Sequence, residues 1–262
     1  MSERTALVRR PSPNLGDGIV THLERRPVDA ALAVSQHEAY VAALESAGWR
    51  VRWLPPADDL PDGVFVEDTV VVCDDLAVLG RPRVPERAGE IPSMEGTVTG
   101  LGLEVTRIDE GFLDGGDVLQ VGNTVYAGRS ARTNEDAICQ LTRQVATRGR
   151  RLVPVALNDC LHLKSAMTAL PDGSLIGVPD LVDTSALPYL RVAQEPAGAH
   201  VVVLGEKQVL VGASAPRTAE QLAAEGYDVT VVDIGEFEKL EGCVTCLSVL
   251  IPGKPGCAER RA

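Results

Sequence analysis

The stretch VLQVGNTVYAGRSARTNEDAICQLTRQVA (residues 118–146) decides the fold class of this chain of 262 residues. It opens with two short apolar runs, residues 118–121 and 124–127, which are typical of strands. Residues 133–146 carry apolar side chains at helical spacing, with acidic side chains near the positive end of the helix dipole. The stretch therefore predicts a pair of strands followed by an amphipathic helix.

The same alternation extends over most of the chain. Short runs rich in β-branched and aromatic residues predict further strands, and periodic apolar positions predict further helices. The strands are expected at residues 51–54, 64–72, 152–155, 200–204, 209–211 and 229–232, and the helices at 28–46, 86–100 and 218–225. Strands that alternate with helices predict an α/β protein.

An internal repeat accompanies this alternation. GRSART (128–133) and GASAPRT (212–218) each follow a predicted strand pair and precede a predicted helix. In addition, Glu67, Asp114 and His162 are separated by 47 and 48 residues. A unit of that length could be stacked or arranged around an axis, so that equivalent strand ends meet at one central site. The alternative is that α/β units resemble one another by chance.

Composition and charge narrow the classes of function. No Pro/Gly-rich linker divides the chain, so we expect one catalytic domain over residues 1–262. The net charge of −12 argues against nucleic acid or a membrane surface as partner. It suits a cationic ligand, although an acidic surface more often serves only solubility. Since no signal core and no apolar run of membrane-spanning length is visible, we expect a cytoplasmic protein.

Six cysteines are present, and most fit the role of small buried apolar residues. Disulfides are unexpected in a reducing compartment. Cys246, in EGCVTCLS (241–248), is the candidate nucleophile. A nucleophilic thiol needs an acid/base partner and an orienting carboxylate brought together by the fold, and His162 and Asp114 are suited to these roles. Taken alone, His162 also fits a core histidine, and Asp114 also fits the cap of a tight turn.

The pair of cysteines in this segment permits a redox or zinc interpretation. A thioredoxin-like motif requires a helix after its first cysteine, whereas the strand-like run 247–251 follows here. A structural zinc site requires a second pair of ligands at close spacing, and the sequence offers none. We therefore expect no metal and no cofactor, with zinc conceivable only as an inhibitory ligand of Cys246.

Glu67 and Asp68 are adjacent carboxylates in the predicted strand 64–72. Alternation along a strand would send them to opposite faces, so one of them should face the interior or a cleft. The simpler interpretation is an ion pair with an arginine of the protein. The functional one is a pocket for a guanidinium group, which donates parallel hydrogen bonds to a carboxylate. Nucleotide binding is not indicated, since Gly-x-Gly-x-x-Gly and Walker A patterns are missing.

Five short motifs occur in a characteristic order. They are FVED (65–68), LDGGD (113–117), SARTN (130–134), LHLK (161–164) and VTCLS (244–248). With this set the chain resembles the dimethylarginine dimethylaminohydrolase family of the guanidine-modifying (amidinotransferase) superfamily, from about Leu15 to Ile251. The resemblance implies an α/β fold, a five-bladed α/β propeller of pseudo-symmetric ββαβ modules.

The resemblance also implies roles for individual residues. Cys246 would be the nucleophile, His162 the general acid/base and Asp114 its orienting partner, at a position where relatives may carry Glu. The remaining implied residues surround the substrate: Glu67 and Asp68 at the guanidinium, Phe65 beside them, Arg87 and Arg132 at the α-carboxylate, Asp62 with Leu240 and Glu241 at the α-amino group, and Ile19 in a lid over residues 13–27 with Gly16 and Gly18 as hinges.

The implied reaction is hydrolysis of Nω-methylated arginines to citrulline and dimethylamine or methylamine, through a thiouronium intermediate on Cys246. The expected partner is thus a small cationic amino acid, and the protein would be a monomer or a homodimer. Two alternatives remain: an arginine deiminase-like hydrolase, although deiminases generally carry an additional helical insertion, and a protein that binds arginine derivatives without converting them.

Overall fold

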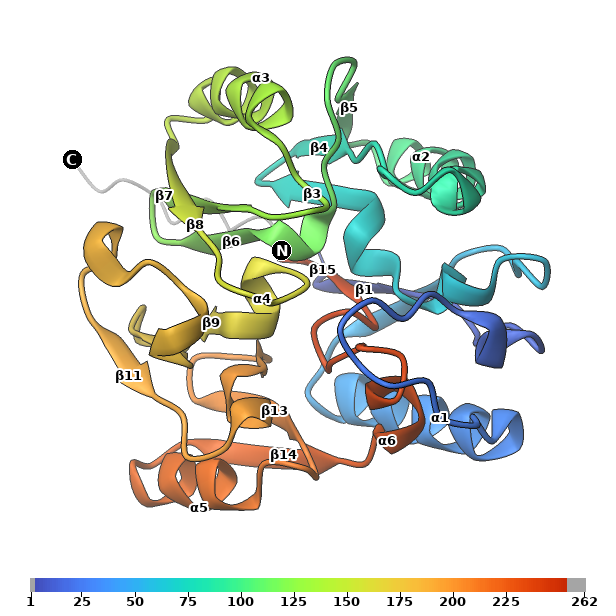
Figure 1. The fold of residues 1–262 in the computed structure, drawn as a ribbon, viewed down its shortest axis with the longest axis vertical. Helices are drawn as coiled ribbons and strands as arrows, with labels where there is room; N and C mark the ends of the chain where they lie inside the picture. Colours follow the sequence, from blue (N-terminus) through green and yellow to red (C-terminus); the bar gives the residue numbers. More distant parts are fainter. Residues whose placement is uncertain (1–2, 254–262) are drawn as a thin grey trace.

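The computed structural model describes residues 3–253. Cys257 lies outside this range. The described chain forms five three-stranded sheets arranged in a ring (Figure 1). The strands are β1 (Thr5–Val8), β2 (Arg50–Trp53), β3 (Val70–Cys73), β4 (Leu76–Leu79), β5 (Glu104–Arg107), β6 (Val118–Val121), β7 (Thr124–Arg129), β8 (Arg151–Ala156), β9 (Met167–Ala169), β10 (Leu175–Gly177), β11 (Leu190–Val192), β12 (Val201–Val203), β13 (Gln208–Gly212), β14 (Asp228–Val232) and β15 (Val249–Ile251). The helices are α1 (Ala30–Ser46), α2 (Ile91–Gly100), α3 (Glu135–Ala146), α4 (Leu163–Ala166), α5 (Pro216–Ala224) and α6 (Gly235–Glu238).

All five sheets share one arrangement of strands. The inner strand pairs antiparallel with the middle strand, and the middle strand pairs parallel with the outer strand. The helices α1, α2, α3 and α5 connect the middle to the outer strand in four sheets, and 3₁₀ turns do so in β9–β10–β11. The predicted five-bladed α/β propeller is confirmed. GRSART and GASAPRT occupy equivalent places, at the ends of β7 and β13.

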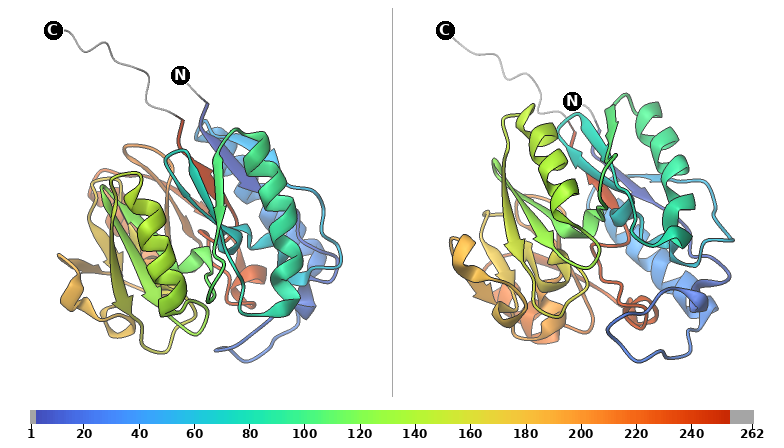
Figure 2. Two further views of the ribbon diagram at one scale, coloured as in Figure 1. Left: turned by 90° about the horizontal axis from the view of Figure 1, so that it is seen from above. Right: turned by 45° about the horizontal axis from the view of Figure 1, so that its top comes forward.

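The two ends of the described chain meet in one sheet. β15 pairs antiparallel with β1, so that Thr5 lies opposite Ile251 and Leu7 opposite Val249. Figure 2 shows these strands side by side, with the long helices on the outside of the ring. The pairing closes the ring and covers a strand edge that would otherwise be open. It also fixes the loop that precedes β15, which carries Cys246.

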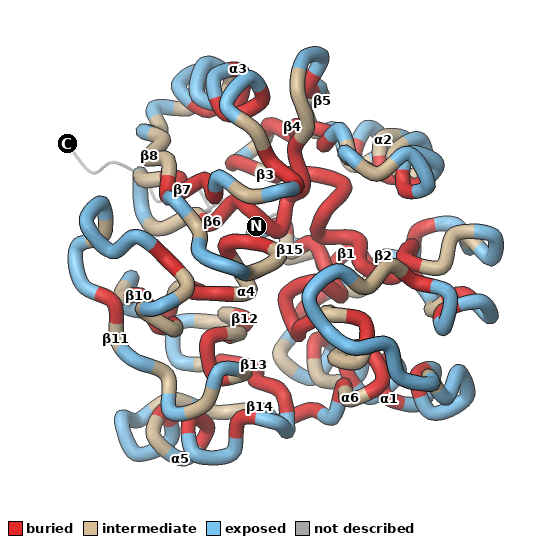
Figure 3. The backbone as a smooth tube through the Cα atoms, viewed as in Figure 1, coloured by how far each residue is buried: buried red, intermediate tan, exposed pale blue. Residues whose placement is uncertain are grey.

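The helices pack on the sheets with one face and expose the other, as Figure 3 shows. α3 buries Ile138, Leu141 and Val145, and its outer positions are exposed. The side chain of Asn134 accepts a hydrogen bond from the N–H of Ala137 and caps the helix. The helix expected from residue 133 therefore begins at Glu135. None of the helices within residues 3–253 has the length and apolar character needed to cross a bilayer.

The strand expected over residues 64–72 is wrong in its first half. Pro61–Val64 and Val66–Thr69 are 3₁₀ turns, and the strand begins only at Val70. Residues 64–69 are buried throughout, and a short, fully buried apolar run does not reveal its own backbone geometry. The short strands β4, β5, β9, β10 and β11, of three or four residues each, were not predicted either.

The inner strands surround a cavity of about 250 Å³. β3, β6, β9, β12 and β15 all contribute side chains to its wall, so the cavity lies at the centre of the ring. The turns that lead into these five strands lie at one end of the ring, because each inner strand occupies an equivalent place in its module. The residues in these turns are therefore brought together by the fold.

Candidate active site

Candidate site residues occupy the turns before four of the inner strands. Asp68 lies in the 3₁₀ turn that precedes β3, and Asp114 lies just before β6. His162 precedes α4 and β9, and Cys246 lies three residues before β15. The expected convergence of equivalent strand ends is therefore present in the structure.

His162 lies between two carboxylates. Its Nε2 is 3.2 Å from Oδ2 of Asp114, and its Nδ1 is 3.8 Å from Oδ1 of Asp68. A Cβ atom on Gly116 would come within 2.7 Å of His162 Nδ1 and of Asp68 Oδ1, so only glycine permits this approach. This packing explains why LDGGD follows Asp114 with two glycines.

The charge on His162 is set by its neighbours. Burial lowers the pKa of the imidazole, but the negative charges of Asp68, Asp117 and Asp114 outweigh it and raise the pKa to about 10. Asp117 contacts this region through the backbone, since its Oδ1 accepts a hydrogen bond from the N–H of Leu163 at 2.9 Å. His162 is thus a cation in the resting site, ready to donate a proton.

Cys246 and His162 line the same small cavity, which has a volume of about 20 Å³. The predicted residues that also line this cavity are Ile19, Asp62, Phe65, Asp68, Arg87, Arg132, Leu240 and Glu241. Asp114 lies behind His162, against its Nε2. A space of this size holds about one water molecule, so the polar groups on its wall lie close together.

Arg87 and Asp68 form a buried ion pair on the wall of the cavity. Arg87 Nη1 lies 2.6 Å from Oδ2 of Asp68, and the guanidinium donates two further hydrogen bonds to Glu90, at 2.9 and 2.8 Å. Burial by itself raises the pKa of Asp68, but the charges of His162 and Arg87 outweigh it and lower the pKa. Asp68 is therefore a carboxylate. Both Arg87 and Arg132 are buried rather than solvated surface charges.

Residues 13–27, the expected lid, cover the cavity. The N–H of Ile19 donates to both carboxylate oxygens of Asp62, at 3.1 and 3.2 Å. The N–H groups of Thr21, His22 and Leu23 all donate to Oε1 of Glu241, with the His22 contact the shortest of the three. Arg132 Nη2 donates to the Thr21 hydroxyl at 3.3 Å. The segment is held in a closed position by these bonds.

Glu241 is the main latch of this lid. A carboxylate oxygen that accepts three consecutive backbone N–H groups is bound as an anion is bound in a backbone nest. Glu241 itself has φ of +63°, in the left-handed region that non-glycine residues rarely adopt. Its Oε2 is buried without a hydrogen-bond partner among the described residues. No local pattern in the sequence predicted this role of the Glu241 side chain.

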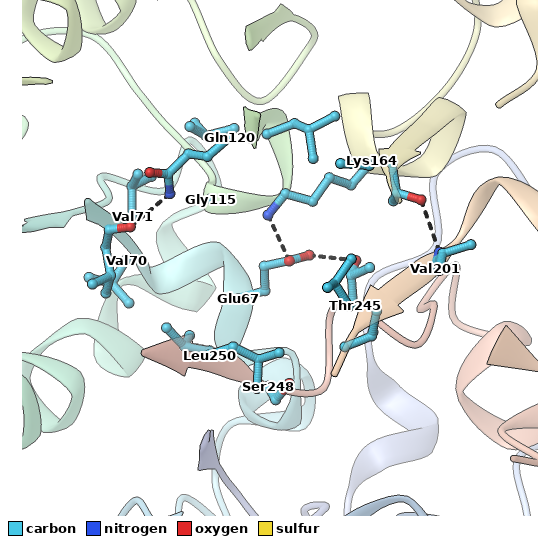
Figure 4. A pocket seen from close by; sticks show the side chains of 18 residues that line it. Glu67, Val70, Val71, Gly115, Gln120, Lys164, Val201, Thr245, Ser248 and Leu250 are labelled. Atoms are coloured by element: carbon cyan, nitrogen blue, oxygen red, sulfur yellow. Dashed lines mark hydrogen bonds and ion pairs between the residues drawn. The ribbon is translucent and has the colours of Figure 1, made fainter. Parts of the chain in front are cut away.

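Glu67 does not lie where the resemblance implied. Its carboxylate accepts hydrogen bonds from Lys164 Nζ at 2.7 Å and from the Thr245 hydroxyl at 2.8 Å, facing the central cavity of the ring (Figure 4). Asp68, its neighbour, faces the cavity of Cys246 instead. The two carboxylates do point to opposite sides, but on a 3₁₀ turn rather than a strand. Glu67 thus contacts the Cys246 loop from behind.

Cys246 has a second sulfur beside it. Its Sγ lies 3.3 Å from Sγ of Cys243, and the N–H of Cys243 lies 3.4 Å from the Cys246 sulfur. The hydrogen bond with Cys243, burial and the negative charges of Glu67 and Asp68 raise the pKa of the Cys246 thiol.

The side chains that could hold a metal ion lie around His162 rather than at Cys246. Ligand atoms of Asp68, Asp114 and His162 lie within 4.8 Å of one another, and this is the group of potential metal ligands within residues 3–253. It does not include Cys246. The inhibitory zinc expected at Cys246 therefore stays a prediction.

Sequence reasoning missed several residues of the site. Leu161 and Gly242 line the cavity, although each directly adjoins a predicted residue. A Cβ on Gly242 would come within 2.3 Å of the Phe65 ring, which signals a close approach that glycine alone permits. Glu90 pairs with Arg87 within the same 3₁₀ turn, three residues further along the chain. Lys164 pairs with Glu67 across 97 residues, so no local pattern reveals that pair.

Comparison with known proteins gives a consistent result. The family described as "Arginine deiminase" matches residues 58–201. The chain is similar to N(G),N(G)-dimethylarginine dimethylaminohydrolase of Streptomyces coelicolor, with 52% identity over 251 residues that cover 95% of this chain and 97% of that protein. The protein of the same name from Pseudomonas aeruginosa is 33% identical over 248 residues, covering 93% of this chain and 97% of that protein.

Solved structures show the same relationship. A mutant of the Pseudomonas aeruginosa enzyme complexed with citrulline has a TM-score of 0.88 and 31% identity, over 96% of this chain and 100% of that chain. A dimethylarginine dimethylaminohydrolase adduct with S-methyl-L-thiocitrulline has a TM-score of 0.86 and 32% identity, with the same coverage. Identity and coverage over nearly the full length show that the chain belongs to the dimethylarginine dimethylaminohydrolase family.

Proposed function

We propose that the protein hydrolyses Nω-methylated arginines to citrulline and dimethylamine or methylamine. The observation that carries the proposal is the shared cavity, in which a thiol and a protonated imidazole lie together with buried carboxylates and arginines. A methylarginine has a guanidinium at one end and an amino acid group at the other, and both kinds of partner are available there. The names of the relatives point to the same substrate.

Asp68 is the proposed ligand of the guanidinium. It is buried, ionised and on the cavity wall, and an ionised carboxylate accepts charge-assisted hydrogen bonds from a planar guanidinium. Phe65 and Leu161 contribute apolar walls beside it. Glu67 was expected at the guanidinium as well, but the Lys164 and Thr245 contacts direct its carboxylate away from this cavity. Glu67 is therefore proposed as a support of the Cys246 loop.

The amino acid end of the substrate is assigned to other charged groups on the wall of the same cavity. Arg132 and Arg87 supply positive charge for the α-carboxylate. Asp62 and the backbone carbonyls of Leu240 and Glu241 are suited to the α-amino group. Ile19 closes the cavity from the lid side. Because the cavity has room for about one water molecule and Ile19 of the lid lines it, we propose that the lid opens to admit the substrate.

The chemistry follows in two stages. Arrival of the cationic guanidinium beside Cys246 lowers the pKa of its thiol, so that the thiolate forms and attacks the guanidinium carbon. His162, oriented by Asp114, gives its proton to the departing dimethylamine, leaving a thiouronium group on Cys246. Neutral His162 then takes a proton from water, and the resulting hydroxide adds to the same carbon. The C–S bond breaks and the hydroxyl proton passes to the Cys246 sulfur, which releases citrulline and restores the thiol.

This scheme draws only on groups of the protein and water, so the proposed enzyme works without a metal or organic cofactor. We further propose that it acts in the cytoplasm, which is consistent with the five free cysteines among the described residues. Its partner is the small cationic substrate, and it works as a monomer or a homodimer.

The direct test is formation of citrulline from asymmetric dimethylarginine, monomethylarginine and arginine by the purified protein. The proposal predicts turnover of the methylated substrates and loss of turnover in Cys246→Ser. Faster conversion of arginine would instead identify the alternative deiminase activity. Tight binding of methylarginine to folded wild-type protein without any product would identify a binding protein instead.

A further inference from the structure

Cys243 is the buried group in the Cys246 loop that the proposed reaction does not use. Only 3% of its surface is exposed, and it is absent from the wall of the substrate cavity, which Cys246 lines. Yet the two sulfur atoms are 3.3 Å apart. Cys243 therefore lies directly behind the proposed nucleophile, within reach of it but shielded from the substrate.

The backbone between the two cysteines permits a disulfide. The N–H of Cys246 donates to the carbonyl of Cys243 at 3.1 Å, which closes a four-residue turn. Such a turn brings its first and last Cα atoms to within about 7 Å, near the range found for disulfide-bonded cysteines. The sulfur atoms would have to approach by roughly 1.3 Å to reach the length of about 2 Å of a disulfide bond. Side-chain rotation supplies a movement of that size.

The surrounding hydrogen bonds keep Cys243 directed at Cys246. Thr245 donates its one hydroxyl hydrogen to Glu67, so its oxygen is left to accept from Cys243, whose sulfur lies 3.3 Å away. Cys243 thus has Cys246 on one side and Thr245 on the other. No larger rearrangement is needed for the two sulfurs to meet.

We propose that Cys243 is the resolving thiol of a reversible redox switch that converts Cys246 into a disulfide and so turns the hydrolase off. The inference rests on the proposed function insofar as Cys246 is the nucleophile. The oxidant is a small hydroperoxide, which reaches Cys246 through the substrate cavity when the lid opens.

The chemistry balances in two steps. Hydrogen peroxide oxidises the Cys246 thiol to a sulfenic acid, the O–O bond breaks, and one water leaves. The Cys243 thiol then attacks the sulfenic sulfur, an S–S bond forms, and the hydroxyl leaves with the Cys243 proton as a second water. Reduction by a dithiol reverses the change. Without a resolving thiol, further peroxide would carry Cys246 to a sulfinic acid, which dithiols do not reduce.

The test compares the wild-type protein with Cys243→Ser, and with Cys139→Ser as a control that removes an exposed thiol far from the site. Each is treated with hydrogen peroxide, and then with dithiothreitol in a second sample. Intact mass and fragmentation spectra report the state of each cysteine, and citrulline formation reports activity. The mass measurement needs no turnover, so it stands even if the proposed substrate is wrong.

After peroxide treatment, the wild type and Cys139→Ser should lose activity, and their mass should fall by two hydrogen atoms because Cys243 is linked to Cys246. Dithiothreitol should restore both the activity and the original mass. Cys243→Ser should instead gain two oxygen atoms at Cys246 and stay inactive after reduction. The proposal is overturned if wild-type Cys246 reaches the sulfinic acid as fast as the variant does. It is equally overturned if Cys246 forms its disulfide with a cysteine other than Cys243.

Discussion

At the scale of single residues, the unusual feature is a buried histidine that keeps its proton. Three carboxylates raise the pKa of His162 to about 10, against 6.5 for the unperturbed side chain. The folded protein therefore holds a proton that the unfolded chain releases above pH 6.5. The resulting stabilisation is complete below pH 6.5 and is lost as the pH rises toward about 10.

This gives a prediction for stability. Between pH 6.5 and 10, the free energy of unfolding of the wild type should fall relative to that of His162→Gln, by up to about 1 kcal/mol per pH unit. Urea unfolding at several pH values measures both proteins, and the variant accounts for all other titrating groups. A difference between the two that stays constant with pH would mean that His162 is neutral in the folded state.

Glu67 supplies a second prediction at this scale. It supports the Cys246 loop through Thr245 and does not line the substrate cavity. Glu67→Ala should therefore lower kcat, by up to about a hundredfold if the nucleophile is displaced by an ångström, and should leave KM nearly unchanged. Glu67→Gln, which still accepts a hydrogen bond from Thr245, should lose less. Steady-state kinetics decide the matter, and a large rise in KM at constant kcat would place Glu67 at the substrate after all.

At the scale of elements, the lid is held by one side chain. Glu241 accepts three backbone N–H groups from residues 21–23. Glu241→Ala should open the lid more often and raise KM roughly tenfold, since charged hydrogen bonds contribute about 1.5–3 kcal/mol each when buried and less at a partly exposed rim. Glu241→Gln keeps an acceptor oxygen and should retain more of the affinity.

Limited trypsin digestion reports on the same lid independently of turnover. Arg25 and Arg26 lie in the lid, and Arg25 donates to the carbonyls of Gly16 and Gly18 at 2.7 and 2.6 Å. Because Pro27 blocks cleavage after Arg26, the bond after Arg25 is the site, and its cleavage should accelerate in Glu241→Ala and remain close to the wild-type rate in Glu241→Gln. Equal cleavage rates in all three proteins would show that Glu241 does not latch the lid.

The element scale also shows what the sequence could predict. α3 was predicted because its acidic first turn and its apolar face agree. The segment that carries Glu67 and Asp68 was assigned to a strand because its apolar run is continuous. The two buried carboxylates of this segment pair with different cations: Glu67 with Lys164 on one side, and Asp68 with Arg87 on the other. These partners are 97 and 19 residues away, so no local pattern contains them.

At the scale of the whole molecule, the site exists only because the ring closes. The lid follows β1, the proposed nucleophile precedes β15, and these two strands pair with each other. The 47- and 48-residue spacing predicted that Asp114 and His162 lie close together. In the structure, His162 Nε2 lies 3.2 Å from Asp114 Oδ2. Alternation predicted that Glu67 and Asp68 point to opposite sides, but the spacing carried no information on which of the two faces the site.

The central claim is that Cys246, and not Cys243, becomes covalently bound to the substrate. The decisive measurement is an acid quench of the protein during turnover of asymmetric dimethylarginine, followed by intact and fragment mass spectra. The account predicts an added mass equal to the substrate less dimethylamine, located on Cys246, retained in Cys243→Ser and missing in Cys246→Ser. An adduct on Cys243, or citrulline formed by Cys246→Ser, would contradict it.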